Sequence, residues 1–109
     1  MDGTIVKGTT PTIQYIFNDI NVSEIVAAYF TIRQSDVAVI EKGLTDADVD
    51  TETSSVSWTL DQEDTLQLYP GGTVIAFLDW VLENGTRGSG RIAKFMIAPT
   101  GKDEVISVE

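Results

Sequence analysis

The sequence predicts an all-β protein, an immunoglobulin-like antiparallel β-sandwich of about seven short strands with one short helical turn. Hydrophobic residues recur at every second position along nearly the whole chain, which is the period of a half-buried strand. Turn-forming residues separate these segments at near-regular spacing, and no connection is long enough for a good helix. The chain has 109 residues, so we expect a single domain, residues 1–109, with one core.

Four strands are expected in the first part of the chain, at residues 4–7, 13–17, 26–34 and 37–42. Gly8 to Pro11 separates the first two strands, and Asn18-Asp19 ends the second. Ser35-Asp36 is a tight hairpin turn between the last two. One face of the third strand is apolar and is expected in the core, with Ala28, Phe30 and Ile32.

The middle of the chain predicts a loop, a strand and a capped helical turn. Residues 43–54 are polar and acidic, which indicates a loop, with a short edge strand inside it as the alternative. The next strand, residues 56–60, places three apolar side chains on one face: Val56, Trp58 and Leu60. Asp61 then acts as a helix N-cap and Asp64 completes a capping box. Residues 70–72, Pro-Gly-Gly, end the helical turn.

Residues 73–82 alternate two sets of side chains, and both sets are largely apolar. One set comprises Val74, Ala76, Leu78 and Trp80, and the other comprises Ile75, Phe77, Asp79 and Val81. This pattern indicates a central strand, or one whose outer face meets a partner. Asn84-Gly85 is the strongest hairpin signal in the chain, and residues 91–98 are the expected partner strand. Residues 105–108 are the candidate for a last edge strand.

Two residue types that carry much of enzyme chemistry, cysteine and histidine, are absent from the sequence. Without cysteine there is no disulfide, zinc–thiolate site or thiol nucleophile, which fits synthesis in a reducing cytoplasm. Without histidine there is no Ser-His-Asp triad and no imidazole acid–base group. A pair of carboxylates for glycoside hydrolysis is the remaining enzyme alternative, but nothing singles out a pair. We therefore predict that the protein is not an enzyme and has no catalytic residue.

The chain is strongly acidic, with a formal net charge of −10 from 17 acidic and 7 basic residues. A phosphate backbone or an anionic lipid surface would repel it, so we expect no nucleic-acid partner and no membrane partner. The charge either only keeps the domain soluble or suits a basic protein partner. The first residues lack the pattern of a secretion signal, and the longest apolar run, residues 25–30, is too short to span a bilayer.

Two polar segments are candidate ligand sites. Four carboxylates alternate like the start of a calcium loop, namely Asp46, Asp48, Asp50 and Glu52. Thr51 stands where the loop glycine belongs and Ser57 where the last glutamate belongs, so we expect a solvent-facing surface with no metal and no cofactor. Residues 85–91 are glycine-rich with two arginines, but they follow a hairpin turn. A flexible strand connection is therefore expected there rather than an anion cradle.

The candidate binding residues lie on the outward side of residues 73–82 and its neighbours. Trp58 and Trp80 are in phase with core positions, so we expect both in the core rather than in a sugar-stacking platform. Outward apolar side chains that are exposed together would form a patch that needs a partner. Nearby arginines could then bind a carboxylate of that partner. The candidate partner interface comprises Tyr29, Ile75, Phe77, Val81, Arg87 and Arg91.

Three segments carry a family resemblance: Lys-Gly-Thr-Thr-Pro-Thr-Ile at residues 7–13, Val-Ser-Trp-Thr-Leu-Asp-Gln-Glu-Asp-Thr-Leu at residues 56–66, and Phe77-Leu-Asp-Trp80 followed by Asn84-Gly-Thr-Arg87 and Ser89. On these motifs the chain, along most of its length, resembles small structural proteins of phages and prophages of Gram-positive bacteria. It is similar to the immunoglobulin-like N-terminal domain of phage baseplate upper proteins. Members of that family often carry a polar residue at the position of Phe77, so this chain departs from the pattern there.

The resemblance implies a non-enzymatic structural component of a tailed phage or prophage particle. The protein would be located in the tail or baseplate of the virion and synthesised in the cytoplasm of the bacterial host. It would contact other tail or baseplate proteins and form a homo-oligomer in the assembled particle, because tails and baseplates are rotationally symmetric. The alternative from a different class is a carbohydrate- or cell-surface-binding β-sandwich module.

Overall fold

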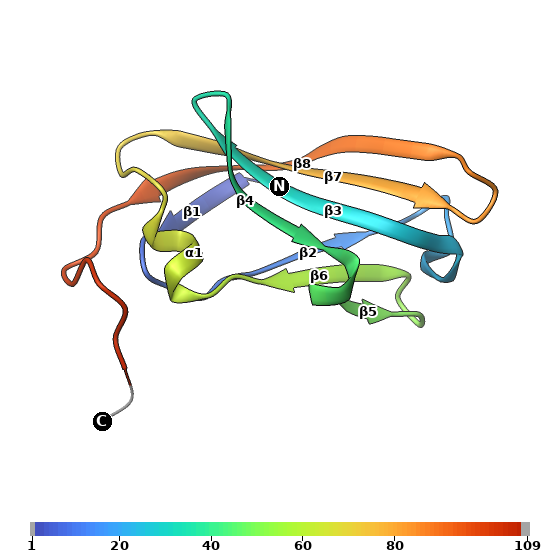
Figure 1. The fold of residues 1–109 in the computed structure, drawn as a ribbon, viewed down its shortest axis with the longest axis horizontal. Coiled ribbons are helices and arrows are strands. Elements are labelled where there is room, and N and C mark those ends of the chain that lie inside the picture. Colours follow the sequence, from blue (N-terminus) through green and yellow to red (C-terminus); the bar gives the residue numbers. More distant parts are fainter. Residues whose placement is uncertain (1, 108–109) are drawn as a thin grey trace.

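Two β-sheets face each other in the computed structural model, which describes residues 2–107 (Figure 1). The strands are β1 (Asp2–Val6), β2 (Thr12–Ile16), β3 (Ile25–Gln34), β4 (Val37–Gly43), β5 (Asp48–Asp50), β6 (Ser55–Thr59), β7 (Thr73–Leu82) and β8 (Arg87–Ala98). The large sheet has the order β1-β8-β7-β3-β4, and the small sheet has the order β2-β6-β5. The prediction of an all-β sandwich is confirmed.

Helical structure is short within the described part of the chain. It comprises one α-helix, α1 (Gln62–Leu66), and two 3-10 turns, η1 (Val22–Glu24) and η2 (Leu44–Asp46). No helix within residues 2–107 is long and apolar enough to cross a membrane. The predicted single helical turn is α1, and the two 3-10 turns connect strands.

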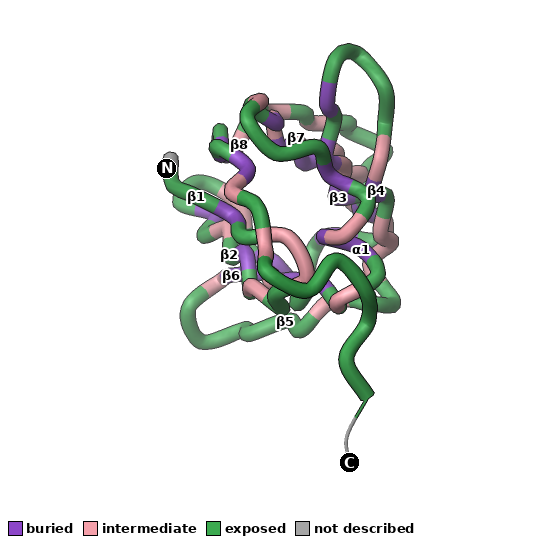
Figure 2. Tube along the Cα trace, turned by 90° about the vertical axis from the view of Figure 1, so that its left-hand side faces the viewer, coloured by how far each residue is buried: buried purple, intermediate pink, exposed green. Residues whose placement is uncertain are grey.

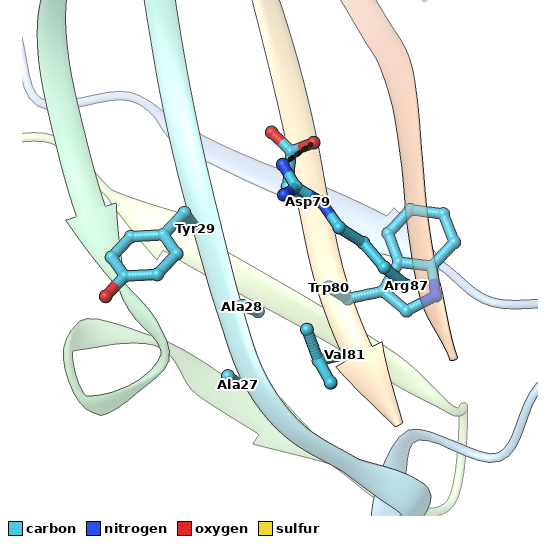
Figure 3. Close-up of a pocket in the computed structure, with 7 residues that line it drawn as sticks. All are labelled: Ala27, Ala28, Tyr29, Asp79, Trp80, Val81 and Arg87. Carbon is cyan, nitrogen blue, oxygen red and sulfur yellow. Dashed lines mark hydrogen bonds and ion pairs between the residues drawn. The ribbon is translucent and has the colours of Figure 1, made fainter. Parts of the chain in front are cut away.

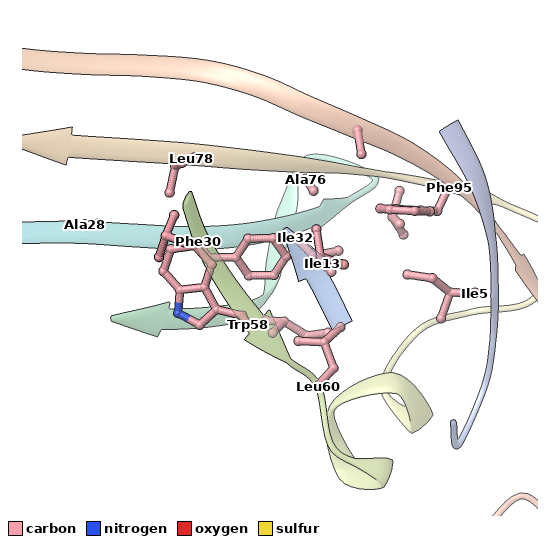
Figure 4. Close-up of a cluster of buried hydrophobic side chains, with 14 of the residues drawn as sticks. Ile5, Ile13, Ala28, Phe30, Ile32, Trp58, Leu60, Ala76, Leu78 and Phe95 are labelled. Atoms are coloured by element: carbon pink, nitrogen blue, oxygen red, sulfur yellow. The ribbon is translucent and has the colours of Figure 1, made fainter. Parts of the chain in front are cut away.

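The core lies between the two sheets. Figure 2 marks buried residues along the strands of both layers, and Figure 4 shows side chains of the buried hydrophobic cluster. The large sheet contributes Phe30 and the small sheet contributes Trp58, whose rings stack with centroids 5.2 Å apart and 20° between their planes. The Trp58 Nε1–H donates a hydrogen bond to the Gly43 carbonyl oxygen at 2.9 Å. The predicted apolar face of β3 is buried, with Ala28, Phe30 and Ile32.

The hairpin between β3 and β4 turns at Ser35 and Asp36, as predicted. Both residues have positive φ angles, 52° and 64°, which is the backbone required at both central positions of a type I′ turn. Next to this turn, the buried Gln34 amide binds the backbone of Tyr69 in both directions. Gln34 Nε2 donates to the Tyr69 carbonyl oxygen at 3.0 Å, and the Tyr69 N–H donates to Gln34 Oε1 at 2.8 Å. The hairpin therefore anchors the loop that leads into β7.

The strand β6 and the helix α1 form as the sequence predicts. The Asp61 side chain accepts a hydrogen bond from the Asp64 N–H at 2.8 Å, and the Asp64 side chain accepts one from the Asp61 N–H at 3.0 Å. This reciprocal pair is the predicted capping box. The Thr65 hydroxyl donates to the Thr9 carbonyl oxygen at 2.8 Å, so α1 also holds the segment that precedes β2.

The prediction of a flexible connection across residues 85–91 is wrong. The turn is confined to residues 83–86, and β8 already begins at Arg87, four residues earlier than expected. The physical reason is a close approach between neighbouring strands. The Trp80 indole lies against Gly88, and a Cβ at Gly88 would be only 2.2 Å from Trp80 Cε2. Gly88 therefore serves packing within a strand rather than flexibility.

Two further features differ from the expected elements. The acidic segment contains β5, so the edge-strand alternative for residues 43–54 is correct and the described strands number eight. β1 pairs in parallel with β8, whereas the other strand pairings are antiparallel. No hairpin joins β1 to β8, so chain connection does not impose an antiparallel pairing.

The C-terminal segment does not form the predicted edge strand. Residues 105–107 are not in a strand, and residue 108 lies outside the described residues. The chain leaves the large sheet after Ala98 and runs past α1 (Figure 1). There the Gln62 side chain replaces a strand partner. Gln62 Nε2 donates to the Ile106 carbonyl oxygen at 3.0 Å, and the Ile106 N–H donates to Gln62 Oε1 at 2.7 Å.

Candidate interaction surface

The outer face of the large sheet, meaning the face turned away from the small sheet, carries all of the predicted interface residues. Strand register places Val81 opposite Arg87 and Phe77 opposite Arg91, on β7 and β8. On the other side of β7, Tyr29 of β3 lies opposite Asp79. The alternation of β7 points its other set of side chains into the core. The structure thus brings together on one face Tyr29, Ile75, Phe77, Val81, Arg87 and Arg91.

The apolar part of the outer face is a partly covered stripe rather than a bare patch. Tyr29 is 54% exposed, whereas Ile75, Phe77 and Val81 are half-buried among their neighbours on adjacent strands. Met96 of β8, 59% exposed, lies on the same face opposite Thr73. Its outward position follows from the period of β8 and could have been found from the sequence.

A small hollow lies on this face near the hairpin that joins β7 to β8 (Figure 3). Its volume is about 260 Å³, and it is lined by Ala27, Ala28, Tyr29, Asp79, Trp80, Val81 and Arg87. One rim carries an ion pair, with Arg87 Nη2 3.5 Å from Asp79 Oδ1. Small-molecule sites usually span about 300–1,000 Å³, so this hollow suits one protruding side chain of a protein partner better than a substrate.

Two carboxylates of the 56–66 motif, those of Asp61 and Asp64, have structural contacts. Asp64 is buried and its Oδ2 lies 3.0 Å from Lys42 Nζ of β4, in addition to its capping contact. The hydrogen bond to Asp64 raises the pKa of the Lys42 ammonium above its ordinary value, against the opposing effect of burial, and the charges of Asp64, Asp61 and Asp46 add to it. This ion pair joins the edge of the large sheet to α1.

Replacing Lys42 by methionine is expected to lower the free energy of unfolding by about 1–2 kcal/mol, the range for a hydrogen bond to a charged group after discounting for partial exposure. The raised pKa in the folded state means that the contribution is complete below the unfolded pKa, about 10.4, and is lost as pH rises through the folded value. Urea denaturation at several pH values should therefore show a constant difference in the free energy of unfolding between the unmodified protein and Lys42→Met from about pH 7 to 9. That difference should shrink above about pH 10.5.

The matched control is Lys102→Met. Its ion pair with Glu104 also spans 3.0 Å, but the two side chains are 62% and 75% exposed. Its loss should change stability by less than about 0.5 kcal/mol. An equal effect of the two substitutions would contradict the structural role of the Lys42–Asp64 pair.

The acidic segment forms a turn and an edge strand in the structure. Asp50 Oδ1 accepts hydrogen bonds from the N–H groups of Glu52 at 2.9 Å and Thr53 at 3.4 Å, which closes the turn between β5 and β6. Asp48 and Asp50 are exposed. Within residues 2–107, no group of three acidic side chains is close enough to hold a metal ion.

Both tryptophans lie inside the sandwich. Trp58 is 1% exposed, and Trp80 is half-buried with its ring 5.3 Å from Phe17 and 6.4 Å from Tyr15, measured between centroids. Neither indole offers an open face of the kind that stacks on sugars. The exposed aromatic side chains within residues 2–107 are Tyr29 and Tyr69. Tyr69, in the loop before β7, was not singled out by the sequence pattern because it lies outside any strand.

Comparisons with known proteins bear on the fold. The sequence matches no protein-family model and no curated protein sequence. Among solved structures, CopC from Methylosinus trichosporium OB3b aligns with a TM-score of 0.54 at 14% identity, covering 91% of this chain and 87% of that one. AggA, the major subunit of aggregative adherence fimbriae type I from Escherichia coli, aligns at 13% identity over 91% and 89% of the two chains, but its TM-score of 0.31 is too low to support an inference. The chain has the immunoglobulin-like β-sandwich fold.

Proposed function

We propose that this protein is a non-enzymatic structural component of a tailed phage or prophage particle, located in the tail or baseplate, and that it acts through protein–protein contacts. The observation that carries the proposal is the outer face of the large sheet. There an apolar stripe with Tyr29, Phe77 and Val81 lies beside arginines, and Tyr29 and Val81 line a hollow sized for a side chain. Aromatic residues and arginine are enriched in the centres of protein interfaces.

The motifs that resemble phage proteins support the same role, because their side chains serve the fold. The 56–66 motif supplies the core residue Trp58 and the capping box of α1. The 7–13 motif supplies the turn into β2, in which Gly8 has a φ angle of 80°. The Thr65–Thr9 hydrogen bond joins the two motifs. A motif used in this way suits a mounting module, whose task is to present a rigid surface.

The proposed setting is the assembled virion, with neighbouring tail or baseplate proteins and further copies of this chain as partners. Sheet faces and strand edges are common docking elements. The Phe77 side chain, apolar where the related proteins often carry a polar group, adds apolar surface to this docking face. The alternative of a sugar-binding module gains no support from the tryptophans, because both are turned inward.

Mass spectrometry of gradient-purified particles from the strain that carries the gene is expected to detect this protein at a constant ratio to a major tail protein. The substitution Phe77→Asp should lower its incorporation, since a carboxylate in the centre of an apolar contact is unfavourable. Val37→Asp is the matched control, because Val37 is 61% exposed at the tip of the β3–β4 hairpin, outside this face. Particles that lack the protein in repeated preparations would contradict the proposal.

A further inference from the structure

The charged side chains of the strands are divided between the two outer faces of the sandwich. By strand register, the outer face of the large sheet carries three acidic positions, Asp2, Glu41 and Asp79, and four basic ones, namely Arg33, Arg87, Arg91 and Lys94. These four are more than half of the seven basic residues in the chain. A protein with a net charge of −10 thus presents one locally basic face.

The outer face of the small sheet has the opposite character. The strands β2, β5 and β6 contain no lysine or arginine. Asp48 and Asp50 lie opposite Ser57 and Ser55 of β6, on the side away from the core, and Glu52 follows in the exposed turn. We call Asp48, Asp50 and Glu52 the acidic ridge. The two outer faces therefore complement each other in charge.

Apolar groups are present beside the charges on both faces. On the small sheet, Ile16 of β2 is 50% exposed and lies opposite Ser55, in the same row as Asp50. On the large sheet, Tyr29 lines the hollow and Phe77 lies opposite Arg91. A contact between the two faces would bury apolar side chains together with complementary charges, which is the composition of a specific interface.

Arg91 is the basic residue of this face that is best placed to bind a carboxylate of another molecule. Arg87 is already 3.5 Å from Asp79, and an Arg33 Nη2–H donates to the Asp36 carbonyl oxygen. Arg91 is exposed and has no ion pair among the described residues. Its guanidinium is free to form a bidentate pair with a carboxylate.

We propose that the outer face of the large sheet binds the acidic ridge of a second copy of this chain, so that the protein self-associates head to tail. Such a contact joins two different surfaces and leaves one of each unused, so repetition closes a ring or extends a filament. This inference deepens the proposed function, since it names a partner for the same surface and rests on the proposed particle for its biological setting. The contact itself is a property of the purified protein.

The test reverses one charge on each of the two surfaces and measures self-association by sedimentation velocity. The measurements are made at about 0.15 M salt over protein concentrations up to about 1 mM. The unmodified protein should form larger species as its concentration rises. Arg91→Glu and Asp48→Lys should each weaken association roughly tenfold or more, because each places like charges in contact. An equimolar mixture of the two variants should restore association, since both kinds of contact then pair opposite charges.

Two control variants change the net charge by the same amounts as Arg91→Glu and Asp48→Lys, but at positions outside both surfaces. Lys102→Glu and Glu104→Lys, in the C-terminal segment, should leave association unchanged. A protein that stays monomeric throughout, a mixture that fails to recover, or an Arg91→Glu variant that associates more strongly would overturn the proposal. The last result would indicate contact between two basic faces. None of these outcomes affects detection of the protein in purified particles, so the two proposals can fail separately.

Discussion

Replacing Trp58 by alanine is expected to lower the free energy of unfolding by about 3–5 kcal/mol, the range for large aromatic residues removed from a core. The side chain is 1% exposed and stacks on Phe30, so it joins the small sheet to the large one. Its removal leaves a cavity between two sheets that the surrounding strands cannot readily close. Urea denaturation followed by far-ultraviolet circular dichroism measures the loss.

A second substitution separates packing from hydrogen bonding at the same position. Trp58→Phe keeps an aromatic ring but removes the Nε1–H that donates to the Gly43 carbonyl oxygen. We expect a smaller loss, about 1–3 kcal/mol, from the unsatisfied oxygen and the reduced volume. Tyr69→Ala, at a side chain that is 74% exposed, should change stability little. Similar losses for Trp58→Ala and Tyr69→Ala would contradict the assigned core position.

Replacing Gly88 by alanine is expected to lower the free energy of unfolding by about 3 kcal/mol, the upper range for an overpacked core. The new methyl group would lie 2.2–2.5 Å from three atoms of the Trp80 indole. That ring cannot move freely, because it packs edge-on against Phe17 and is stacked near Tyr15. The tryptophan emission should also change as Trp80 is displaced, which thermal and fluorescence measurements on one sample can record.

Gly90→Ala is the matched control. Gly90 lies two residues along the same strand, and an added Cβ would meet no atom within 4 Å. Neither glycine has a positive φ angle, so backbone conformation does not distinguish them. Gly90→Ala should be neutral or stabilise by about 0.4–1 kcal/mol through the unfolded chain. Equal losses at both positions would mean that strand propensity, rather than contact with Trp80, determines the effect.

The contrast between these glycines shows what the sequence can and cannot predict. Alternation correctly predicted β7 and its two faces, because that period depends only on local geometry. The capping box at Asp61 and the turn at Ser35-Asp36 were also predicted, since neighbours in the chain form them. The role of Gly88 depends on a side chain from another strand, and no local pattern in residues 85–91 reveals that contact.

The candidate interface was also predictable only where it depends on local strand geometry. Strand period was sufficient to place Tyr29 and Phe77 on one outer face. Arg91 joins them through an irregularity that the period does not predict. The register of β7 and β8 shifts between Ala76 and Phe77, whereas plain alternation would place Arg91 in phase with the buried Ala93. How far each side chain is covered depends on neighbours across the sheet, so the partial burial of Phe77 could not be predicted. The opposite charges of the two outer faces became visible only once the strands were assigned to sheets.

The parallel pairing of β1 with β8 also constrains how the protein is made. Among the eight strands, β1 leaves the ribosome first and β8 last, yet Ile5 of β1 lies opposite Ile97 of β8 and both are buried. The first strand must therefore wait for this partner until all the other described strands have been translated. Contacts between distant parts of a chain slow folding, so this edge of the large sheet is expected to form late and to leave apolar surface open to chaperones in the meantime.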